Sequence, residues 1–132
     1  MEQLLFSDAW SEQSIAATLA SPFSLALIAE CEGKICGYLL ASLLPPEGEL
    51  YRIGVHPDFR RRGIALSLME DFLLVAEKRG SAELFLEVRA DNAGAIALYR
   101  RTGFLDDGIR RGYYKEPIAD ALLMRRKSKK AE

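Results

Sequence analysis

The chain has 132 residues, of which 49% are hydrophobic and 28% charged, with a formal net charge of -1. This size and composition predict one compact domain with a single core. The near-neutral charge excludes a nucleic-acid-binding surface spread over the whole chain, and the apolar runs at 25–29 and 38–44 are far shorter than the ~20 residues that cross a bilayer. No charged-then-apolar leader opens the chain, so we expect a cytoplasmic protein that binds neither membrane nor nucleic acid directly.

The first third of the chain predicts a helix followed by a β hairpin. Ser11 can act as the N-cap of a short helix that ends near residue 21. The segments 23–31 and 35–44 are rich in Ile, Leu, Phe and Tyr, and the intervening Glu32–Lys34 is typical of a tight turn. We therefore expect two antiparallel strands here.

The two cysteines lie on either side of this turn, so that Cys31 and Cys36 face each other across the hairpin. Buried thiols and a disulfide are both compatible with this spacing, and we favour thiols because nothing else marks the chain as secreted. Since His56 is the only histidine, a zinc site of four side chains would need carboxylates in convenient places, and no metal is expected.

The middle of the chain predicts a strand, a loop and the longest helix. Residues 45–48 break the chain before a strand at 49–55. From Gly63 to Lys78 the apolar residues recur at intervals of three and four, which is typical of an amphipathic helix, and Gly80 can end it.

The last third of the chain alternates strands and helices. Residues 84–88 predict a short strand, and residues 92–101 a helix that Asp91 can cap. Two further strands, 104–110 and 119–126, flank a polar, aromatic connection. The alternation after residue 49 implies crossover units, and hence an α/β fold with a mixed sheet and helices on its faces.

The chain ends in a cluster of cations within residues 125–130. We interpret residues 1–126 as the folded domain and residues 127–132 as a disordered basic tail. The alternative is that the tail anchors the protein to RNA or the ribosome, in which case its deletion would weaken a strongly salt-dependent interaction.

The sharpest local feature joins the strand at 49–55 to the long helix. Three arginines, 60–62, precede Gly63 and the small Ala65 at the helix start. The first turn of a helix has unpaired N–H groups and the positive end of the helix dipole, so it can bind a pyrophosphate. Neither a Gly-Lys-Ser/Thr ending nor Gly-x-Gly-x-x-Gly is present, so we expect a ligand other than a nucleoside triphosphate or a nicotinamide cofactor.

The pattern Arg60-x-x-Gly63-x-Ala65 after a strand resembles the coenzyme A signature of the GNAT superfamily of N-acetyltransferases. Further segments look like its RimI branch, the ribosomal-protein alanine N-acetyltransferases, and extend the likeness over nearly the whole chain. These segments are 9–12, 86–92, 95–99, 103–104, 110–114 and 120–124.

The resemblance implies a GNAT fold and acetyl transfer from acetyl-CoA to an amine, with the N-terminal alanine of a small-subunit ribosomal protein as the expected acceptor and a monomer or weak dimer as the expected state. An α-amino group of pKa ~7.7–8.0 is on the order of 10% neutral at pH 7, whereas lysine at ~10.4 is below about 0.1% neutral. An N-terminal acceptor therefore needs a weaker base than lysine does. Two alternatives stay open: a GNAT enzyme for a lysine or small-molecule amine, and a coenzyme A-binding regulator without turnover.

The same resemblance assigns roles within the site. Glu87 would be the general base, acting through water, and Tyr99 would protonate the departing thiolate. The Val55 N–H would stabilise the oxyanion. Asn92 lies two helical turns before Tyr99 and shares its face. The expected cofactor-binding residues are Ile53, Gly54, Val55, Arg60, Arg61, Arg62, Gly63, Ile64, Ala65, Leu66 and Asn92.

Two features depart from the family pattern. The family opens with a strand and the beginning of a helix, and Met1 falls inside that first helix of the family pattern, so we expect the first strand to be missing and one sheet edge to be uncovered. Arg52 stands where RimI-like chains usually carry asparagine, which bears on acceptor choice. Tyr113, Tyr114 and Trp10 either shape the acceptor groove or cover the core, and we assign them no catalytic role.

Overall fold

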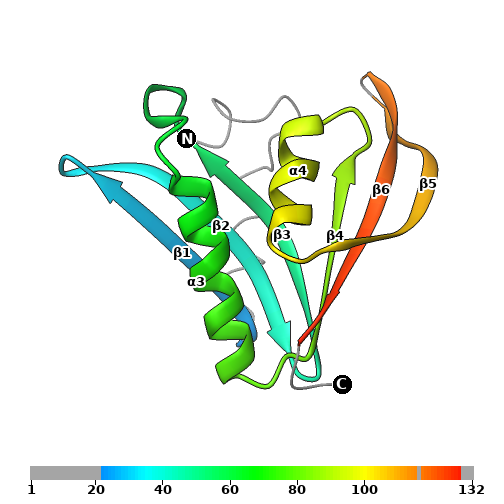
Figure 1. Cartoon of the computed structure of the whole chain (residues 1–132), viewed down its shortest axis with the longest axis horizontal. Helices are drawn as coiled ribbons and strands as arrows, with labels where there is room; N and C mark the ends of the chain where they lie inside the picture. Colours follow the sequence, from blue (N-terminus) through cyan, green and yellow to red (C-terminus); the bar gives the residue numbers. More distant parts are fainter. Residues whose placement is uncertain (1–21, 116, 129–132) are drawn as a thin grey trace.

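In the computed structural model, residues 22–115 and 117–128 are described. The expected helix capped by Ser11, the neighbouring Trp10, the expected missing first strand and the last four residues of the tail lie outside these ranges. The described chain forms one sheet with two α-helices packed on the same face (Figure 1). Its elements are β1 (Ser24–Cys31), β2 (Lys34–Leu44), β3 (Glu47–Val55), η1 (Pro57–Phe59), α3 (Ile64–Lys78), β4 (Glu83–Arg89), α4 (Ala93–Arg101), β5 (Leu105–Lys115) and β6 (Ile118–Lys127).

The six strands of the described chain are ordered β1-β2-β3-β4-β6-β5. Neighbouring strands are antiparallel except β3 and β4, which are parallel and joined through α3. A parallel pair requires such a crossover connection. The predicted mixed sheet is therefore confirmed.

Glu32 and Gly33 form the two-residue turn of the predicted hairpin, with φ of 54° and 76°. Two consecutive positive φ angles are typical of the type I′ turn, whose twist matches that of the flanking strands. Cys31 and Cys36 are both free thiols, as we favoured. Burial raises the pKa of Cys36 to about 11, with Cys31 adding to the shift, so this thiol is protonated at neutral pH.

Helix α3 confirms the predicted amphipathic segment. Its buried residues Leu68, Met69, Phe72 and Ala76 follow the spacing of one helical face and join a core cluster with β2, β3 and β4. Gly80 follows the helix at φ 82°, a conformation that glycine adopts without strain. This packing holds the first turn of α3 close to the end of β3.

Strands β3 and β4 pair only over residues 47–50 and 83–86. Tyr51 is the extra residue of a β-bulge opposite Leu40 and Ala41 of β2. A bulge bends its strand and increases the local twist. Beyond the bulge β3 and β4 diverge, and the sheet opens like a V (Figure 1).

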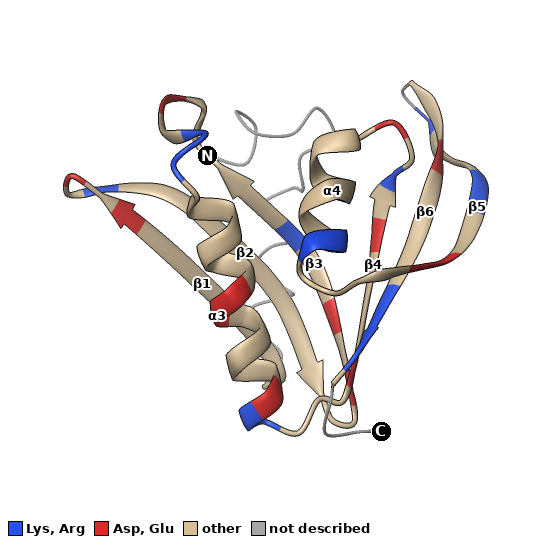
Figure 2. Cartoon of the chain, viewed as in Figure 1, with Lys and Arg blue, Asp and Glu red and all other residues tan. Residues whose placement is uncertain are grey.

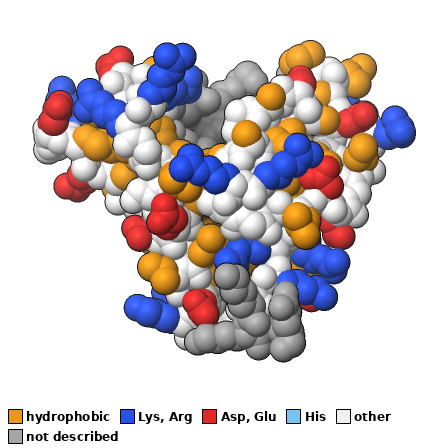
Figure 3. Space-filling view, viewed as in Figure 1, with side chains coloured by type: hydrophobic (Ala, Val, Ile, Leu, Met, Phe, Trp, Pro, Cys, Tyr) orange, Lys and Arg blue, Asp and Glu red, His pale blue; other side chains and the backbone are white. Residues whose placement is uncertain are grey.

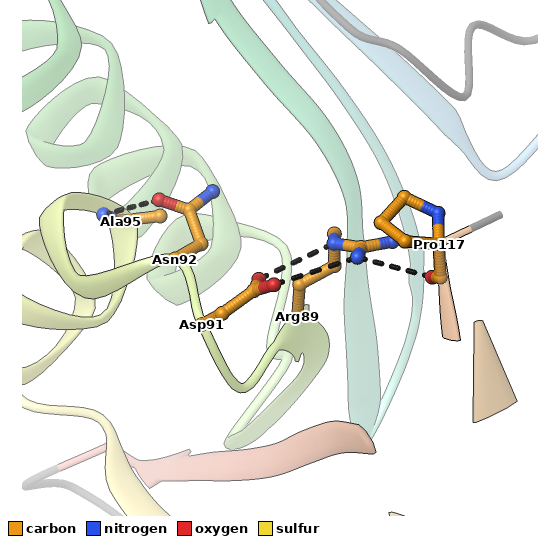
Figure 4. Close-up of polar contacts among 5 residues, drawn as sticks. All are labelled: Arg89, Asp91, Asn92, Ala95 and Pro117. Carbon is orange, nitrogen blue, oxygen red and sulfur yellow. Dashed lines mark hydrogen bonds and ion pairs between the residues drawn. The ribbon is translucent and has the colours of Figure 1, made fainter. Parts of the chain in front are cut away.

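Helix α4 has a different N-cap from the one expected. The Asn92 side-chain oxygen accepts a hydrogen bond from the Ala95 N–H at 3.2 Å. Asp91, the expected cap, instead pairs with Arg89 at 3.3 Å (Figure 4). The expectation for Asp91 was wrong because the turn places this residue one position before the cap, where a neighbouring cation binds its carboxylate.

Strand β5 is longer than predicted and includes Tyr113 and Tyr114, which we expected in a connection between strands. The pairing with β6 is irregular between Arg110 and Tyr114. At this irregularity the Gly112 N–H donates to the Asp120 carboxylate at 2.8 Å. A side chain thus replaces the missing ladder bond, which lets the strand continue.

The end of β6 lies just past the domain boundary expected at residue 126. Lys127 is the last residue of the strand, and its Nζ lies 3.8 Å from Glu83 Oε1. The Ser128 N–H donates to the Ala82 carbonyl at 2.7 Å.

We predict that Gly48→Ala destabilises the fold by roughly 1–3 kcal/mol through overpacking. A Cβ at Gly48 would lie 2.7 Å from methyl groups of Leu43 and Leu84, both buried in the core. Gly94→Ala is the matched control, since nothing lies within 4 Å of its Cβ position and alanine favours a helix. Urea unfolding measures both free energies, and equal stability of the two variants would contradict the packing argument.

Candidate active site

A cleft of about 370 Å³ lies where β3 and β4 separate. Its lining includes Glu87 from β4, Tyr99 from α4, Asn92 at the start of α4, and Ile53 from β3. The neighbours of Glu87 along β4 are buried in the core under the helices, so Glu87 points to the opposite face of the sheet. Because the strands have separated here, a side chain from each face reaches one cavity.

Glu87 lies in a cluster of polar groups from β5. Its Oε1 is 3.3 Å from Nη1 of Arg110, and the Arg110 guanidinium lies over the Tyr113 ring at 5.5 Å. The negative charge of Glu87 is the main cause that raises the pKa of Tyr113, followed by burial. The Glu87 carboxylate is thus held by Arg110 and remains partly exposed.

Tyr99 is almost fully buried, at 7% exposure. Its ring packs edge-on against Phe104, with 6.2 Å between centroids. Burial, with a smaller contribution from Tyr114, raises the pKa of Tyr99 to about 12. The phenol is therefore protonated at neutral pH and has a proton to donate within the cleft.

The loop between β4 and α4 is fixed by side-chain contacts (Figure 4). Arg89 binds the carboxylate of Asp91 and donates to the Pro117 carbonyl at 3.2 Å. Its guanidinium also lies over the Tyr114 ring at 5.0 Å. Since the Asn92 oxygen caps α4, a ligand-binding role for Asn92 falls to its Nδ2 group.

The loop before α3 has the backbone of an anion site. Arg61 and Gly63 have φ of 66° and 75°. Left-handed residues among right-handed or extended ones turn successive N–H groups to one side, which creates an anion-binding concavity. Gly63 is the N-cap of α3 and has no side chain to cover the helix start, and a Cβ built on it would meet nothing within 4 Å. This region is open to a bound diphosphate.

Two of the three arginines of this loop brace it. The Arg60 Nε donates to the Val55 carbonyl at 3.5 Å. Arg62 lies over the Phe59 ring at 5.0 Å and 3.8 Å from Glu32 of the hairpin. The Arg60 N–H also donates to the Pro57 carbonyl at 3.5 Å, so both the side chain and the backbone of Arg60 hold the loop. Basic side chains lie near the start of α3 and on α4 on the face shown (Figures 2 and 3).

The outer half of β3 lies between the loop and the cleft. Ile53, Gly54 and Val55 pair with β2, whereas the pairing of β3 with β4 has ended at Leu50. The edge of β3 that faces β4 therefore has no strand of the described chain paired to it over these residues. An extended ligand can add to such an edge as a further strand does.

The family model for the acetyltransferase (GNAT) family matches residues 1–104 of the chain. The chain belongs to the GNAT acetyltransferase family. It is 36% identical over 126 residues to the [ribosomal protein bS18]-alanine N-acetyltransferase of Escherichia coli (strain K12), which covers 94% of this chain and 84% of that protein. It is 42% identical over 134 residues to the N-alpha-acetyltransferase RimI of Mycobacterium tuberculosis, covering 97% and 83%. The crystal structure of the ribosomal-protein-S18-alanine N-acetyltransferase from Escherichia coli matches with a TM-score of 0.89 at 37% identity, over 96% of this chain and 82% of that one.

As a GNAT enzyme, the protein transfers an acetyl group from acetyl-CoA to an amine. The expected family, fold and RimI resemblance are confirmed. The residues present fit the cosubstrate: the concavity at Gly63 would hold its diphosphate, and the β3 edge at 53–55 would bind the extended pantetheine arm.

Several residues of this GNAT site were not expected from the sequence. Glu49 and Arg89 line the cleft with Glu87, and Arg110 contacts Glu87 directly. Arg52, which stood out as a departure from the family pattern, also lines the cleft. In the sequence, Glu49 alternates with Tyr51, which indicates that both side chains lie on one face of a strand. Strand register decides which residues of the neighbouring strand lie beside Glu49, and the sequence does not show it.

The described residues contain neither a metal-binding cluster nor a membrane-spanning helix. No group of three or more His, Cys, Asp or Glu within 22–115 and 117–128 could hold a metal ion. Among the same residues, no helix has the length and apolar character to span a bilayer.

We predict that Gly63→Ala weakens coenzyme A binding roughly tenfold, because it strains the loop and places a methyl group where the diphosphate approaches the backbone. Gly33→Ala is the matched control: its φ of 76° is nearly the same and its Cβ position is equally open, but it lies in the β1–β2 turn. Calorimetric titration with coenzyme A measures both affinities. An equal loss in both variants would contradict the assignment of the anion site.

We predict that Tyr99 makes the stability of the protein depend on pH in the alkaline range. Because the pKa of Tyr99 is raised to about 12 in the folded state, its contribution is complete below pH ~10, the ordinary tyrosine value, and is lost as the pH rises towards 12. Between about pH 9 and about pH 11, wild-type protein should lose roughly 1 kcal/mol more stability than Tyr99→Phe. Cys36 titrates in both proteins, so the difference in their unfolding free energies isolates Tyr99. Parallel pH curves would show that Tyr99 is not buried as described.

Proposed function

We propose that this enzyme acetylates the α-amino group of a protein N terminus, and that its acceptor is the N-terminal alanine of a small-subunit ribosomal protein. The observation that supports this most directly is the shared cleft of Glu87 and Tyr99. The relatives named for bS18-alanine and N-alpha acetylation support the acceptor class, because they match nearly the whole chain. Ribosomal proteins are made in the cytoplasm, where we expect the enzyme to act, as a monomer or weak dimer.

In this proposal Glu87 and Tyr99 divide the proton chemistry. Glu87, partly exposed and acidic, accepts a proton from the amine through water. The amine nitrogen bonds to the thioester carbonyl carbon and the C–S bond breaks. Tyr99, held neutral by burial, gives its proton to the thiolate and regains one from Glu87 through solvent. The Val55 N–H stabilises the carbonyl oxygen during the attack.

A lysine or small-molecule amine is the second candidate acceptor, because the GNAT family alone does not specify one. The acidity of the amine favours the terminus: a lysine must lose a proton held with a pKa ~2.5 units higher. A terminal amine needs a weaker base than lysine does, and the partly exposed carboxylate of Glu87 meets that need. A coenzyme A-binding regulator would need neither Glu87 nor Tyr99 in contact with the cleft.

The test is an acetylation assay with an alanine-starting peptide and the same peptide carrying lysine but a blocked N terminus. We expect transfer to the first and little to the second. Glu87→Gln should lower kcat by about 10²-fold or more, and Tyr99→Phe by roughly tenfold, because a thiol of pKa ~8.5 is a good leaving group. Glu70→Gln, on the exposed face of α3, is the control. A preference for lysine would reject the acceptor, and equal slow rates in all variants would reject catalysis.

A further inference from the structure

A second, larger groove adjoins the cleft of Glu87 and Tyr99. It has a volume of about 710 Å³ and lies over β3, β4 and β6. Three residues line both cavities, Glu49, Tyr51 and Glu87, so the two cavities meet at these side chains. The smaller cavity contains Tyr99, which in the proposed function serves the thiolate of the cosubstrate. On that basis the larger groove is the side from which an acceptor would arrive.

The pairing of β3 with β4 makes Glu49 and Glu87 neighbours at this junction. Glu49 lies opposite Phe85 of β4, and Glu87 is two residues farther along on the same face. The two carboxylates interact: partial burial raises the pKa of Glu49 first, the charge of Glu87 raises it further, and Arg110 opposes both. Two carboxylates at one junction attract a cation.

The larger groove carries a surplus of negative charge. Four carboxylates, from Glu47, Glu49, Glu87 and Asp107, belong to its described lining, against one lining cation, Arg110, and Asp107 pairs with Arg125 at 3.7 Å. Arg110 pairs with Glu87 at 3.3 Å, and its side chain is 55% exposed. Glu49 and Glu87 thus share one cation in the lining of this groove.

An N-terminal amine matches this charge. With a pKa of ~7.7–8.0 it is about 90% protonated at pH 7, so it reaches the enzyme as an ammonium ion. We propose that Glu49 is a specificity-determining residue that, together with Glu87, binds the acceptor's ammonium group before Glu87 deprotonates it. In this proposal Glu49 contributes to the affinity for the charged acceptor, and Glu87 accepts the proton. This inference rests on the proposed N-terminal acetylation.

The test compares Glu49→Gln with Glu83→Gln in steady-state kinetics on the alanine-starting peptide. Glu83 lies on the same face of β4 but lines neither of the two cavities as described. We expect Glu49→Gln to raise the acceptor KM about five- to tenfold, with kcat and the acetyl-CoA KM within about twofold of wild type. Glu83→Gln should change none of them, and Glu49→Asp should recover part of the acceptor KM.

A binding measurement separates charge recognition from a change in shape. With coenzyme A bound, calorimetry compares the free-amine peptide with its Nα-acetylated form, which has no charge at the terminus. Glu49→Gln should weaken binding of the free-amine peptide only. An unchanged acceptor KM, an equal loss for both peptides, or a fall in kcat alone would overturn the assignment.

The two proposals fail in different ways. Wild-type protein that binds acetyl-CoA but acetylates no peptide N terminus contradicts the proposed function, and the role of Glu49 falls with it. Wild-type activity with unaltered kinetics in Glu49→Gln contradicts only the role of Glu49. Circular dichroism and thermal unfolding of each variant identify any loss that comes from misfolding.

Discussion

The separation of β3 from β4 after Leu50 and Leu86 is the constraint on which the site depends. When two strands separate, the backbone N–H and C=O groups between them lose their hydrogen bonds, which costs free energy unless other partners replace them. Here the bulge at Tyr51 bends β3 away. The opening frees the edge of β3 at 53–55 for an extended ligand and creates a cleft that both faces of the sheet share. A continuous sheet would keep Glu87 and Tyr99 on opposite sides.

Glu87 and Tyr99, to which we assign the proton transfers, have different environments within this one cleft. Tyr99 is buried against Phe104, and burial keeps its phenol neutral. Glu87 points to the wetter face, where Arg110 pairs with its carboxylate at 3.3 Å. The opening of the sheet therefore brings a buried phenol and a partly exposed carboxylate to one cleft.

Hydrogen bonds between side chains and the backbone stabilise the rim of the cleft. Asp120 accepts the Gly112 N–H where β5 and β6 lose their register, and Arg89 ties the loop after β4 to Pro117 (Figure 4). Both contacts position the segment with Tyr113 and Tyr114, of which Tyr114 lies under the Arg89 guanidinium. Both contacts join different segments of the chain, so a local pattern does not reveal them. The error at Asp91 has a local origin, because Arg89, two residues before it, binds its carboxylate.

The order of the described strands and α-helices, the hairpin at Glu32–Gly33, the amphipathic α3 and the family could be predicted from local patterns, because periodicity, turn residues and the Arg60-x-x-Gly63-x-Ala65 motif act over a few neighbouring positions. The position of Glu49 beside Glu87, the pairing of Arg110 with Glu87, and the inclusion of Tyr113 in a strand became visible only in the folded chain. These features depend on strand register: a shift of one strand by a single residue turns every side chain to the other face, and the sequence of one strand does not specify the position of its partner.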